Sequence, residues 1–304
     1  MEKFEVSILG CGCALPTTHH VPSSQVVNVR EKLFMVDCGE GTQLQLRRMH
    51  INFQKLQAVF ISHLHGDHCF GLLGMLSTFA LLDRTAPLHV YAHADLERIL
   101  RPQMEYYGHA FTYGVHFHAI DPSQAAVIYD DRSLQVSTLP LNHRVPCCGF
   151  LFREKPTLPH IRRDMIDFYR IPRFAINAIK QGADWETPGG ERVPWRRLTR
   201  PAEPPRSYAY CSDTAPMPGL AGRLRDVTLL YHEATYCEDR ADKAAQHMHS
   251  TARQAALVAR EAGVGRLLLG HFSRRYDDDG AFLREAQAVF PATLLAAEGQ
   301  TICV

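Results

Sequence analysis

Short apolar runs alternate with stretches of helical periodicity along most of this chain. Runs that are apolar throughout predict strands buried on both faces, whereas an apolar residue at every third or fourth position predicts a helix with one buried side. Strands and helices mixed in this way indicate an α/β fold. The expected strands are Val6–Gly10, Ser24–Val29, Leu33–Val36, Ala58–Ser62, Leu88–Tyr91, Leu134–Leu141, Gly149–Phe152, Tyr208–Cys211, Val227–Tyr231 and Leu267–Leu269. The expected helices are Gly41–Met49, Phe70–Leu82, Asp95–Tyr106, Thr251–Ala262, with Ser250 as its N-cap, and about Ala281–Val289.

Residues 153–206 depart from this pattern because they contain eight prolines. Proline restricts its own backbone and that of the preceding residue, so long elements are not expected here. Two short amphipathic helices are predicted, near Ile161–Tyr169 and Phe174–Lys180. We therefore expect one domain spanning residues 1–304, with an arm inserted at about 153–206 that projects from it and has no core of its own.

The composition is that of an ordinary globular protein, with 46% hydrophobic and 21% charged residues. No apolar run approaches the roughly 20 residues that span a bilayer, and the N-terminus lacks the features of a signal peptide. We expect a cytoplasmic protein without membrane contact. The nine cysteines form no CxxC pair, which favours reduced thiols. Cys11 and Cys13 flank a glycine but lack a partner pair, so they are not predicted to bind metal.

Charge is unevenly distributed, although the net charge is only +1. Leu151–Arg206 contains 12 Lys/Arg and 7 Asp/Glu, a local charge of +5, and the remaining residues carry −4. A basic segment on an acidic body is typical of an appendage that binds a polyanion. The alternative is a solvated loop that happens to be basic.

Four residues of the types that bind metals fall within six positions, directly after an expected buried strand. Residues two apart in an extended backbone point the same way, so His63 and His65 can bind one ion. Gly66 permits a sharp turn, beyond which Asp67 and His68 face a second position. Imidazole and carboxylate ligands at this spacing suit zinc, with manganese as a harder alternative. Without a metal, several ionisable groups would lie uncompensated at a buried strand end.

The hexapeptide His63–His68, HLHGDH, resembles the signature of the metallo-β-lactamase superfamily. Four further motifs match that superfamily in order: DCGEGTQ with Asp37, PLNH with His143, CSDT with Asp213, and GHFS with His271. The resemblance spans essentially the whole chain. It implies a four-layer αββα sandwich of the metallo-β-lactamase fold that binds two zinc ions per subunit, or manganese in their place.

The resemblance also implies which residues hold the two ions, with Asp37 supporting the site without binding metal. From the residues alone, His143 and His271 could each be a ligand or a core histidine with an ordinary hydrogen-bond partner. The fold does not fix the substrate, because the superfamily includes β-lactam, thioester, phosphodiester and redox chemistry. The implied ligands are His63, His65 and His143 for one ion, Asp67, His68 and His271 for the other, and Asp213 between the two.

Three further motifs resemble the ribonuclease Z family, whose members are endonucleases that trim the 3′ trailer from precursor tRNA. HEAT occupies His232–Thr235 after an expected strand, HST occupies His249–Thr251 at the start of a helix, and HFSRRY occupies His271–Tyr276. Together with DCGEGTQ they are more specific than the metal motif alone. The resemblance implies a zinc-dependent endoribonuclease that leaves a 3′-hydroxyl on the tRNA and a 5′-phosphate on the trailer.

The same resemblance suggests roles for individual residues. Two ions would convert a shared water into the hydroxide that attacks phosphorus. His249 would protonate the departing 3′ oxygen, while Glu233 would orient its imidazole and favour the protonated form. Asp67 would help to position the attacking water. His247 is the competing acid, although the HST motif favours His249. The local pattern alone leaves His232 and Glu233 equally explained as an ordinary strand end.

The basic arm lies where ribonuclease Z carries a flexible arm that grips the elbow of tRNA. Lysine and arginine there would contact phosphates without reading bases. This chain lacks the Gly-Pro-rich tip of a common version of the arm and has Ile171–Asn177 in its place, which leaves the mode of contact open. Because the family's arm typically serves the partner's active site, we expect a homodimer.

Other functions stay open on the sequence alone. A phosphodiesterase or arylsulfatase-like esterase acting on small molecules would use the same metals but would not need a basic arm. A non-catalytic RNA-binding relative would have lost ligands, yet every expected ligand position is occupied. A thioesterase or β-lactamase would leave the HEAT and HST motifs unexplained. Deletion of residues 160–185 would test the first alternative, because a nuclease would lose precursor-tRNA cleavage and keep small-substrate turnover.

Overall fold

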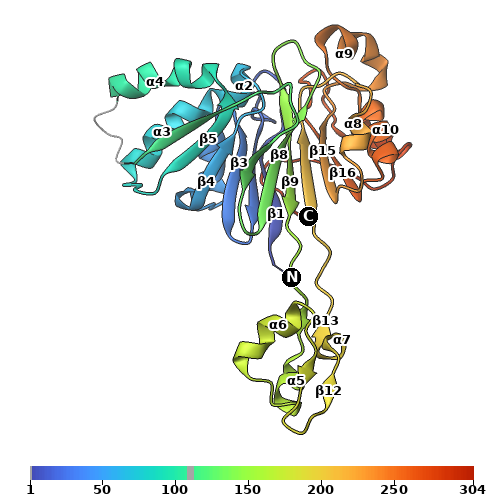
Figure 1. The fold of residues 1–304 in the computed structure, drawn as a ribbon. Coiled ribbons are helices and arrows are strands. Elements are labelled where there is room, and N and C mark those ends of the chain that lie inside the picture. The colour runs from blue at the N-terminus through green and yellow to red at the C-terminus, as the bar shows by residue number, and fades with distance from the viewer. Residues whose placement is uncertain (1, 108–112) are drawn as a thin grey trace. The chain divides into compact units, whose positions relative to one another are not determined.

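Two seven-stranded sheets lie at the centre of the larger of the two units into which the chain divides (Figure 1). This is a computed structural model, and it describes residues 2–107 and 113–304. The larger unit consists of Met1–Arg153 and Arg206–Val304, and we call it the catalytic unit. The smaller consists of Glu154–Pro205, and we call it the inserted unit.

Each sheet is built from one half of the catalytic unit, apart from a single edge strand. In spatial order the first sheet contains β18 (Thr301–Cys303), β1 (Phe4–Gly10), β2 (Ser24–Val29), β3 (Lys32–Cys38), β4 (Leu56–Phe60), β5 (Leu88–His93) and β6 (Val115–Ile120). The second contains β17 (Thr293–Leu295), β16 (Arg266–Gly270), β15 (Leu229–Glu233), β14 (Ser207–Cys211), β9 (Cys148–Glu154), β8 (Leu134–Pro140) and β7 (Val127–Asp130).

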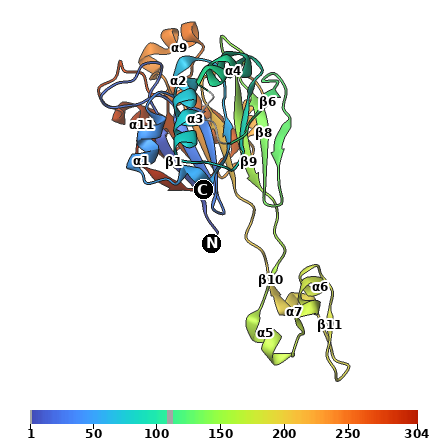
Figure 2. The ribbon, with the colours of Figure 1, turned by 90° about the vertical axis from the view of Figure 1, so that its left-hand side faces the viewer.

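Helices cover the outer face of each sheet, which gives four layers (Figure 1 and Figure 2). The helices of the first half are α1 (Thr42–Arg48), α2 (Gly66–Cys69), α3 (Gly71–Leu81) and α4 (Asp95–Tyr107), with the 3₁₀ turn η1 (Phe53–Lys55). Those of the second half are α8 (Leu220–Arg223), α9 (Ala241–His247), α10 (Ala252–Ala262) and α11 (Gly280–Gln287), with η4 (Glu238–Arg240). None of the described helices has the length and apolarity needed to cross a membrane.

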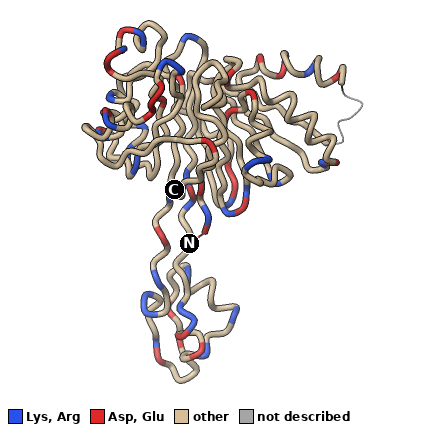
Figure 3. Tube along the Cα trace, turned by 180° about the vertical axis from the view of Figure 1, so that it is seen from behind, with Lys and Arg blue, Asp and Glu red and all other residues tan. Residues whose placement is uncertain are grey.

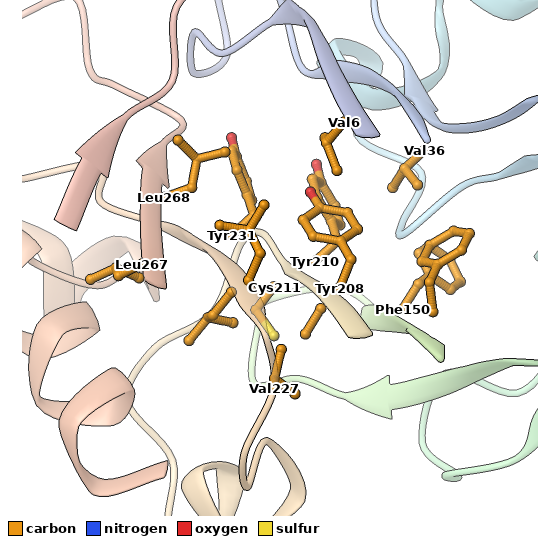
Figure 4. Close-up of a cluster of buried hydrophobic side chains, with 14 of the residues drawn as sticks. Val6, Val36, Phe150, Tyr208, Tyr210, Cys211, Val227, Tyr231, Leu267 and Leu268 are labelled. Atoms are coloured by element: carbon orange, nitrogen blue, oxygen red, sulfur yellow. The ribbon is translucent and has the colours of Figure 1, made fainter. Parts of the chain in front are cut away.

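The main core lies between the two sheets (Figure 4). Phe60 of the first sheet is fully buried, and its ring centroid lies 5.4 Å from that of Phe150 and 5.5 Å from that of Phe152 on the second sheet. Burial of one such side chain contributes about 1.5–3 kcal/mol. A second cluster joins the first sheet to α1, α3 and α4. Packing on both faces explains why the central strands have continuous apolar sequences.

Parallel strands adjoin one another in both sheets. Strands β3, β4, β5 and β6 are mutually parallel in the first sheet, as are β14, β15, β16 and β17 in the second. Ligand sites in such sheets form beyond the carboxyl ends of parallel strands. These are the strand ends at which the sequence motifs occur.

The structure contains every element expected from the sequence, with bounds shifted by a few residues, and adds others. The edge strands β6 and β7 were not expected, because their residues are mostly exposed or half-buried and so lack a buried-strand pattern. The predicted N-cap of α10 was wrong by one residue. Thr251, not Ser250, is the cap, and it forms a capping box with Gln254.

The inserted unit has a small hydrophobic cluster of its own, so the expectation of an arm without a core was wrong. Tyr169, Ile171, Ile179, Val193 and Leu198 are its largest buried side chains. Its elements are β10 (His160–Ile161), α5 (Arg163–Phe168), η3 (Arg173–Ala175), α6 (Ile176–Lys180), β11 (Trp185–Glu186), β12 (Arg192–Val193), α7 (Trp195–Leu198) and β13 (Thr199–Arg200). Proline limits their length but not their packing.

Lysine and arginine outnumber aspartate and glutamate within the inserted unit by ten to seven (Figure 3). The cations are mostly exposed. Arg162 pairs with Asp164 and Arg192 with Asp184, whereas Arg163 has no ion pair with any described residue. The surface of this unit therefore carries cations that are available to an anionic partner.

Candidate metal centre

Five site residues lie at or just beyond the carboxyl ends of parallel strands. Asp37 lies near the end of β3, His63 follows β4, Asp213 follows β14, Glu233 ends β15 and His271 follows β16. Asp37, Asp213 and His271 have φ angles of 56°, 55° and 62°. This left-handed conformation is uncommon for residues other than glycine and costs on the order of 1 kcal/mol or more. Strained backbone at three strand ends turns these side chains toward a common point.

Four potential ligand atoms meet in the first cluster. His65 Nδ1 lies 3.0 Å from His63 Nε2 and 3.3 Å from His143 Nε2. Asp213 Oδ2 lies 3.6 Å from Nε2 of both His63 and His143. Ligands about 2.0–2.2 Å from one ion have separations of this order. The structure thus brings together the four residues expected for the first ion.

A second cluster shares Asp213. Its other oxygen, Oδ1, lies 3.3 Å from His68 Nε2 and 3.1 Å from His271 Nε2. Asp67 Oδ2 lies 3.5 Å from the same His68 nitrogen and 3.7 Å from that of His271. One carboxylate therefore presents one oxygen to each cluster, which is the arrangement a bridging ligand requires.

In three of the histidines, a hydrogen bond made by Nδ1 indicates that Nε2 is free to bind a cation. Nδ1 of His68 donates to Asp37 over 2.7 Å, and Nδ1 of His143 donates to the Met248 carbonyl over 3.1 Å. Nδ1 of His271 donates to the Thr235 hydroxyl over 2.9 Å. Such bonds fix the tautomer and leave the Nε2 lone pair facing the cluster. Nε2 of His68 and of His271 are buried and have no hydrogen-bond partner, which fits metal ions at these positions.

Asp37 is the most heavily bonded of the supporting residues. It is fully buried, and its carboxylate accepts hydrogen bonds from the Ser62 backbone at 2.7 Å, the Ser62 hydroxyl at 2.9 Å and the Tyr210 hydroxyl at 2.7 Å. A carboxylate held by this many donors has little freedom to move. It therefore sets the orientation of the His68 ring.

The electrostatics of the clusters favour cations. Burial raises the pKa of the Asp213 carboxyl, but His271, His68 and His63 outweigh it and hold that pKa well below its usual range. The pKa of Asp67 is likewise lowered by His68 and His271 against the effect of burial. Both carboxyls are therefore ionised at neutral pH. Burial lowers the pKa of His68, yet Asp213 and Asp37 raise it well above its ordinary value, as expected where the local potential is negative.

His249 and Glu233 form a pair beside the clusters. His249 Nδ1 lies 2.8 Å from Glu233 Oε1, and the other Glu233 oxygen accepts from the Thr235 hydroxyl. Burial lowers the pKa of His249, but the Glu233 carboxylate raises it above its ordinary value. His247 lies further out, where Arg144 Nη2 is 3.2 Å from its Nδ1. His232 is buried in β15 and is not among the residues that line the pocket described next.

A pocket of about 580 Å³ opens onto the clusters, and His65, Asp67, His143, Asp213 and His249 contribute to its lining. One wall is formed by residues between Cys13 and Pro22, a segment that we call the N-terminal loop. The Ala14 backbone N–H donates to Asp67 Oδ2 over 2.8 Å. The loop is thus bonded directly to an expected metal ligand.

The side chain of His20 holds the N-terminal loop in place. Its Nε2 lies 2.9 Å from Asp279, and its Nδ1 lies 3.1 Å from Glu298. The hydrogen bond to Asp279, followed by those to Cys11 and Glu298, raises the pKa of His20 to about 12. Glu298 also accepts from the backbone N–H groups of Cys11 and Val21. We call this arrangement the His20 clamp.

Sequence reasoning missed several residues that shape the site, namely Ser62, Thr235, Tyr210 and the whole of the His20 clamp. Ser62 adjoins the HLHGDH motif and Thr235 is the last residue of the HEAT motif, so their positions were a usable signal. His20 and Glu298 are separated by 278 residues, and nothing in the sequence links them. All nine cysteines are free thiols, as expected from the sequence.

Comparison with known proteins decides the family. A protein of Bacteroides fragilis named Ribonuclease Z is 55% identical over 304 residues, a match that covers 100% of this chain and 99% of the relative. This chain belongs to the ribonuclease Z family. The resemblance read from the motifs is thereby confirmed, and the chain is a metal-dependent nuclease that hydrolyses phosphodiesters. The family model described as Anti-Pycsar protein Apyc1 matches residues 4–159, just over half of the chain, which therefore belongs to that family as well.

Solved structures confirm the metallo-β-lactamase fold. Human tRNase Z, short form, has a TM-score of 0.70 and 24% identity, and the match covers 98% of each chain. The metallo-β-lactamase fold protein YhfI of Bacillus subtilis has a TM-score of 0.70 and 20% identity, with 100% of each chain covered. The two sheets and their outer helices follow the layer order of that fold.

Proposed function

We propose that this member of the ribonuclease Z family removes the 3′ trailer from precursor tRNA by hydrolysing one phosphodiester bond. The products would be a tRNA with a free 3′-hydroxyl and a trailer with a 5′-phosphate. The observation that carries the proposal is that two histidine–aspartate clusters and the His249–Glu233 pair lie at one pocket, with members of each in its lining. The names of the B. fragilis relative and of human tRNase Z support the choice of substrate.

The two clusters would hold two divalent ions, zinc or manganese, as their nitrogen and carboxylate donors suit either metal. Divalent ions held there would supply Lewis-acid chemistry, which lowers the pKa of water and neutralises charge that develops on phosphoryl oxygens. The proposed ligands are His63, His65 and His143 for one ion, Asp67, His68 and His271 for the other, and Asp213 for both.

Asp67 and His249 would take part in the chemistry from opposite halves of the catalytic unit. Asp67, fixed by the Ala14 N–H, would orient the attacking water through its carboxylate. His249 would protonate the 3′ oxygen that leaves with the tRNA. Glu233 would keep the His249 imidazole in position and protonated, because its carboxylate lies 2.8 Å away on the opposite side of the ring from Nε2.

The inserted unit would contribute to the binding of the tRNA body. Its exposed arginines suit phosphate contacts that do not depend on sequence. We also propose that the protein works as a homodimer in the cytoplasm, where the inserted unit of one subunit serves the active site of its partner. Light scattering of the purified protein measures the subunit number directly.

Incubation of the purified protein with a 3′-extended tRNA tests the proposal. We expect one dominant cut near the acceptor end, and a His249→Ala variant that keeps its metal but cuts poorly. His247→Ala tests the competing acid, and we expect it to lose much less activity, because Nδ1 of His247 faces Arg144 whereas Nδ1 of His249 faces Glu233. Robust cleavage by His249→Ala would remove His249 from its role.

A small-molecule phosphodiesterase is the alternative that this experiment must exclude. Such an enzyme would hydrolyse bis(p-nitrophenyl) phosphate but leave the extended tRNA intact. Removing the inserted unit sharpens the distinction, because only the nuclease should depend on it. The whole of residues 155–205 should be replaced by a short linker, since deletion of 160–185 alone would leave Val193 and Leu198 without their apolar partners.

A further inference from the structure

The pocket has two chemically different walls. Beside Glu40 and the metal-binding loop, the first half of the chain contributes four apolar residues, Leu15, Pro16, Pro22 and Phe70, which we call the apolar wall. The second half contributes Arg144, Tyr236, His247 and His249, which we call the polar wall. An enzyme that only had to grip phosphate would gain nothing from large apolar side chains beside its metals. The apolar wall therefore indicates a partner surface that is flat and weakly hydrated, such as a nucleobase.

Phe70 is the most exposed aromatic residue of the pocket. Phe70 is 75% exposed, and Leu15 in the same wall is 53% exposed. Exposed aromatic and aliphatic groups that share a pocket are typical of binding surfaces, because leaving them in water is unfavourable. Phe70 and Leu15 stay exposed to water at the mouth of the catalytic pocket, and a bound base would cover them.

The Phe70 ring is held close to the metal-binding loop. A Cβ atom placed on Gly66 would lie 2.4 Å from Cε2 of the ring and 2.6 Å from Cζ, so the ring rests directly against the Gly66 backbone. The backbone N–H of Phe70 also donates to the Gly66 carbonyl over 2.9 Å. Gly66 lies between the proposed ligands His65 and Asp67. The ring is thus supported by protein on one side and open on the other, next to the point of cleavage.

We propose that Phe70, assisted by Leu15, is a stacking platform for the base of the first trailer nucleotide. This inference rests on the proposed function and specifies how that substrate is held. Stacking on an aromatic ring is tolerant of sequence, because every base has a π-face. A platform of this kind suits an enzyme whose substrates differ in their trailers. It positions the RNA strand through a contact that any base can make.

The choice of the trailer side follows from the position of His249. His249 belongs to the polar wall and would protonate the oxygen that departs with the tRNA, so the tRNA strand leaves the scissile phosphate along that wall. The nucleotide on the other side of the phosphorus then meets the apolar wall. Arg144, exposed and held by the Gln246 carbonyl at 2.5 Å, offers its charge to a phosphate of the tRNA strand.

A combination of enzyme and substrate changes tests the platform. The substrates are a 3′-extended tRNA, the same RNA with an abasic first trailer nucleotide, and the same RNA with an abasic last tRNA nucleotide. We expect Phe70→Ala to lower kcat/KM on the intact RNA roughly tenfold, and the abasic trailer nucleotide to lower it equally for the wild type. Phe70→Ala acting on the RNA with the abasic trailer nucleotide should lower kcat/KM no further than either change does alone. Phe70→Trp should retain activity.

Leu81→Ala is the matched control, because Leu81 is 74% exposed at the other end of α3 and does not line the pocket. The metal content of Phe70→Ala should equal that of the wild type. Unchanged cleavage by Phe70→Ala, or losses that multiply on the abasic trailer substrate, would overturn the platform. If the loss caused by Phe70→Ala instead disappeared on the RNA with an abasic last tRNA nucleotide, Phe70 would stack on the tRNA side, and its assignment to the trailer would be overturned. If the wild type left all three RNAs intact, the proposed function would fail, and the platform with it.

Discussion

Asp213 in the catalytic unit and Arg163 in the inserted unit carry single charges in very different surroundings. Asp213 is 2% exposed, and its two oxygens lie within 3.1–3.6 Å of nitrogens from four histidines. Arg163 is exposed at the start of α5 and forms no ion pair within the described residues. The first charge is surrounded by fixed partners, whereas the second is surrounded by water.

The difference follows from the cost of burying charge. A buried ion loses several kcal/mol of hydration, so it persists only where close partners compensate, and those partners fix its position. An exposed charge contributes no more than about 1 kcal/mol and is screened by salt, but several together attract a polyanion. Changes at the metal centre should therefore act mainly on kcat, and changes in the inserted unit on salt-dependent binding.

Removal of Asp213 should have the largest effect. Asp213→Ala deletes an oxygen from each cluster at once, so we expect the metal content to fall and cleavage to drop on the order of 10⁴-fold or more, as for residues that act as one unit. Elemental analysis and single-turnover kinetics provide the measurements. Asp226→Ala is the control, because Asp226 is also an aspartate with positive φ, at 57°, but is exposed. A normal metal content in Asp213→Ala would contradict the bridging role.

Loss of the proposed general acid should rank second. We expect His249→Ala to lower kcat by roughly 10²–10⁴-fold while the metal content and the KM stay close to those of the wild type. The effect should shrink when the leaving group is the weakly basic p-nitrophenolate, which needs no proton. Equal losses on RNA and on bis(p-nitrophenyl) phosphate would show that His249 acts in another way.

Glu233→Gln should give a smaller loss, roughly 10–100-fold, and a change in pH dependence. Burial lowers the pKa of His249 while Glu233 raises it above its ordinary value, so the imidazolium persists to a higher pH in the wild type. An acid must be protonated to act, and activity therefore falls as pH rises through the pKa of His249. Without the carboxylate that fall should begin at lower pH. A kcat–pH profile with an unmoved alkaline limb would argue against this pairing.

Charge removal from the inserted unit should have the smallest effect on chemistry. We expect Arg163→Gln, Arg170→Gln and Arg173→Gln together to raise the KM for precursor tRNA on the order of tenfold at low salt, with kcat nearly unchanged. The plot of log kcat/KM against log salt should become less steep by roughly 0.7–0.9 for each phosphate that the variant no longer binds. Arg98→Gln in α4, which is also exposed, is the control. An unaltered salt slope would indicate that the inserted unit binds something other than phosphates.

The two regions also differed in how well the sequence predicted them. His63, His65, Asp67 and His68 were identifiable because they are neighbours after a buried strand, so local geometry alone brings them together. His143 and His271 could not be assigned from spacing, because they follow β8 and β16 of the second sheet and reach the site only through the packing of that sheet against the first. For these two, the family resemblance supplied what the local pattern could not.

In the inserted unit the prolines correctly predicted short elements. They also led to the wrong prediction that the unit has no core. Tyr169, Ile179 and Leu198 pack together without any regular spacing, and periodicity was the only signal available. Edge strands were missed for a related reason. The residues of β6 alternate between half-buried and exposed, so the strand shows no continuous apolar run.

The His20 clamp has a consequence for the timing of synthesis. His20 is made early, but its partner Glu298 follows 278 residues later, which at about 5–20 residues per second is roughly 15 s to 1 min of translation. Until then one anchor of the N-terminal loop is absent, and the wall that bonds to Asp67 lacks its support. A ribosome-bound nascent chain therefore carries an unfinished pocket until the segment that contains Asp279 and Glu298 has emerged.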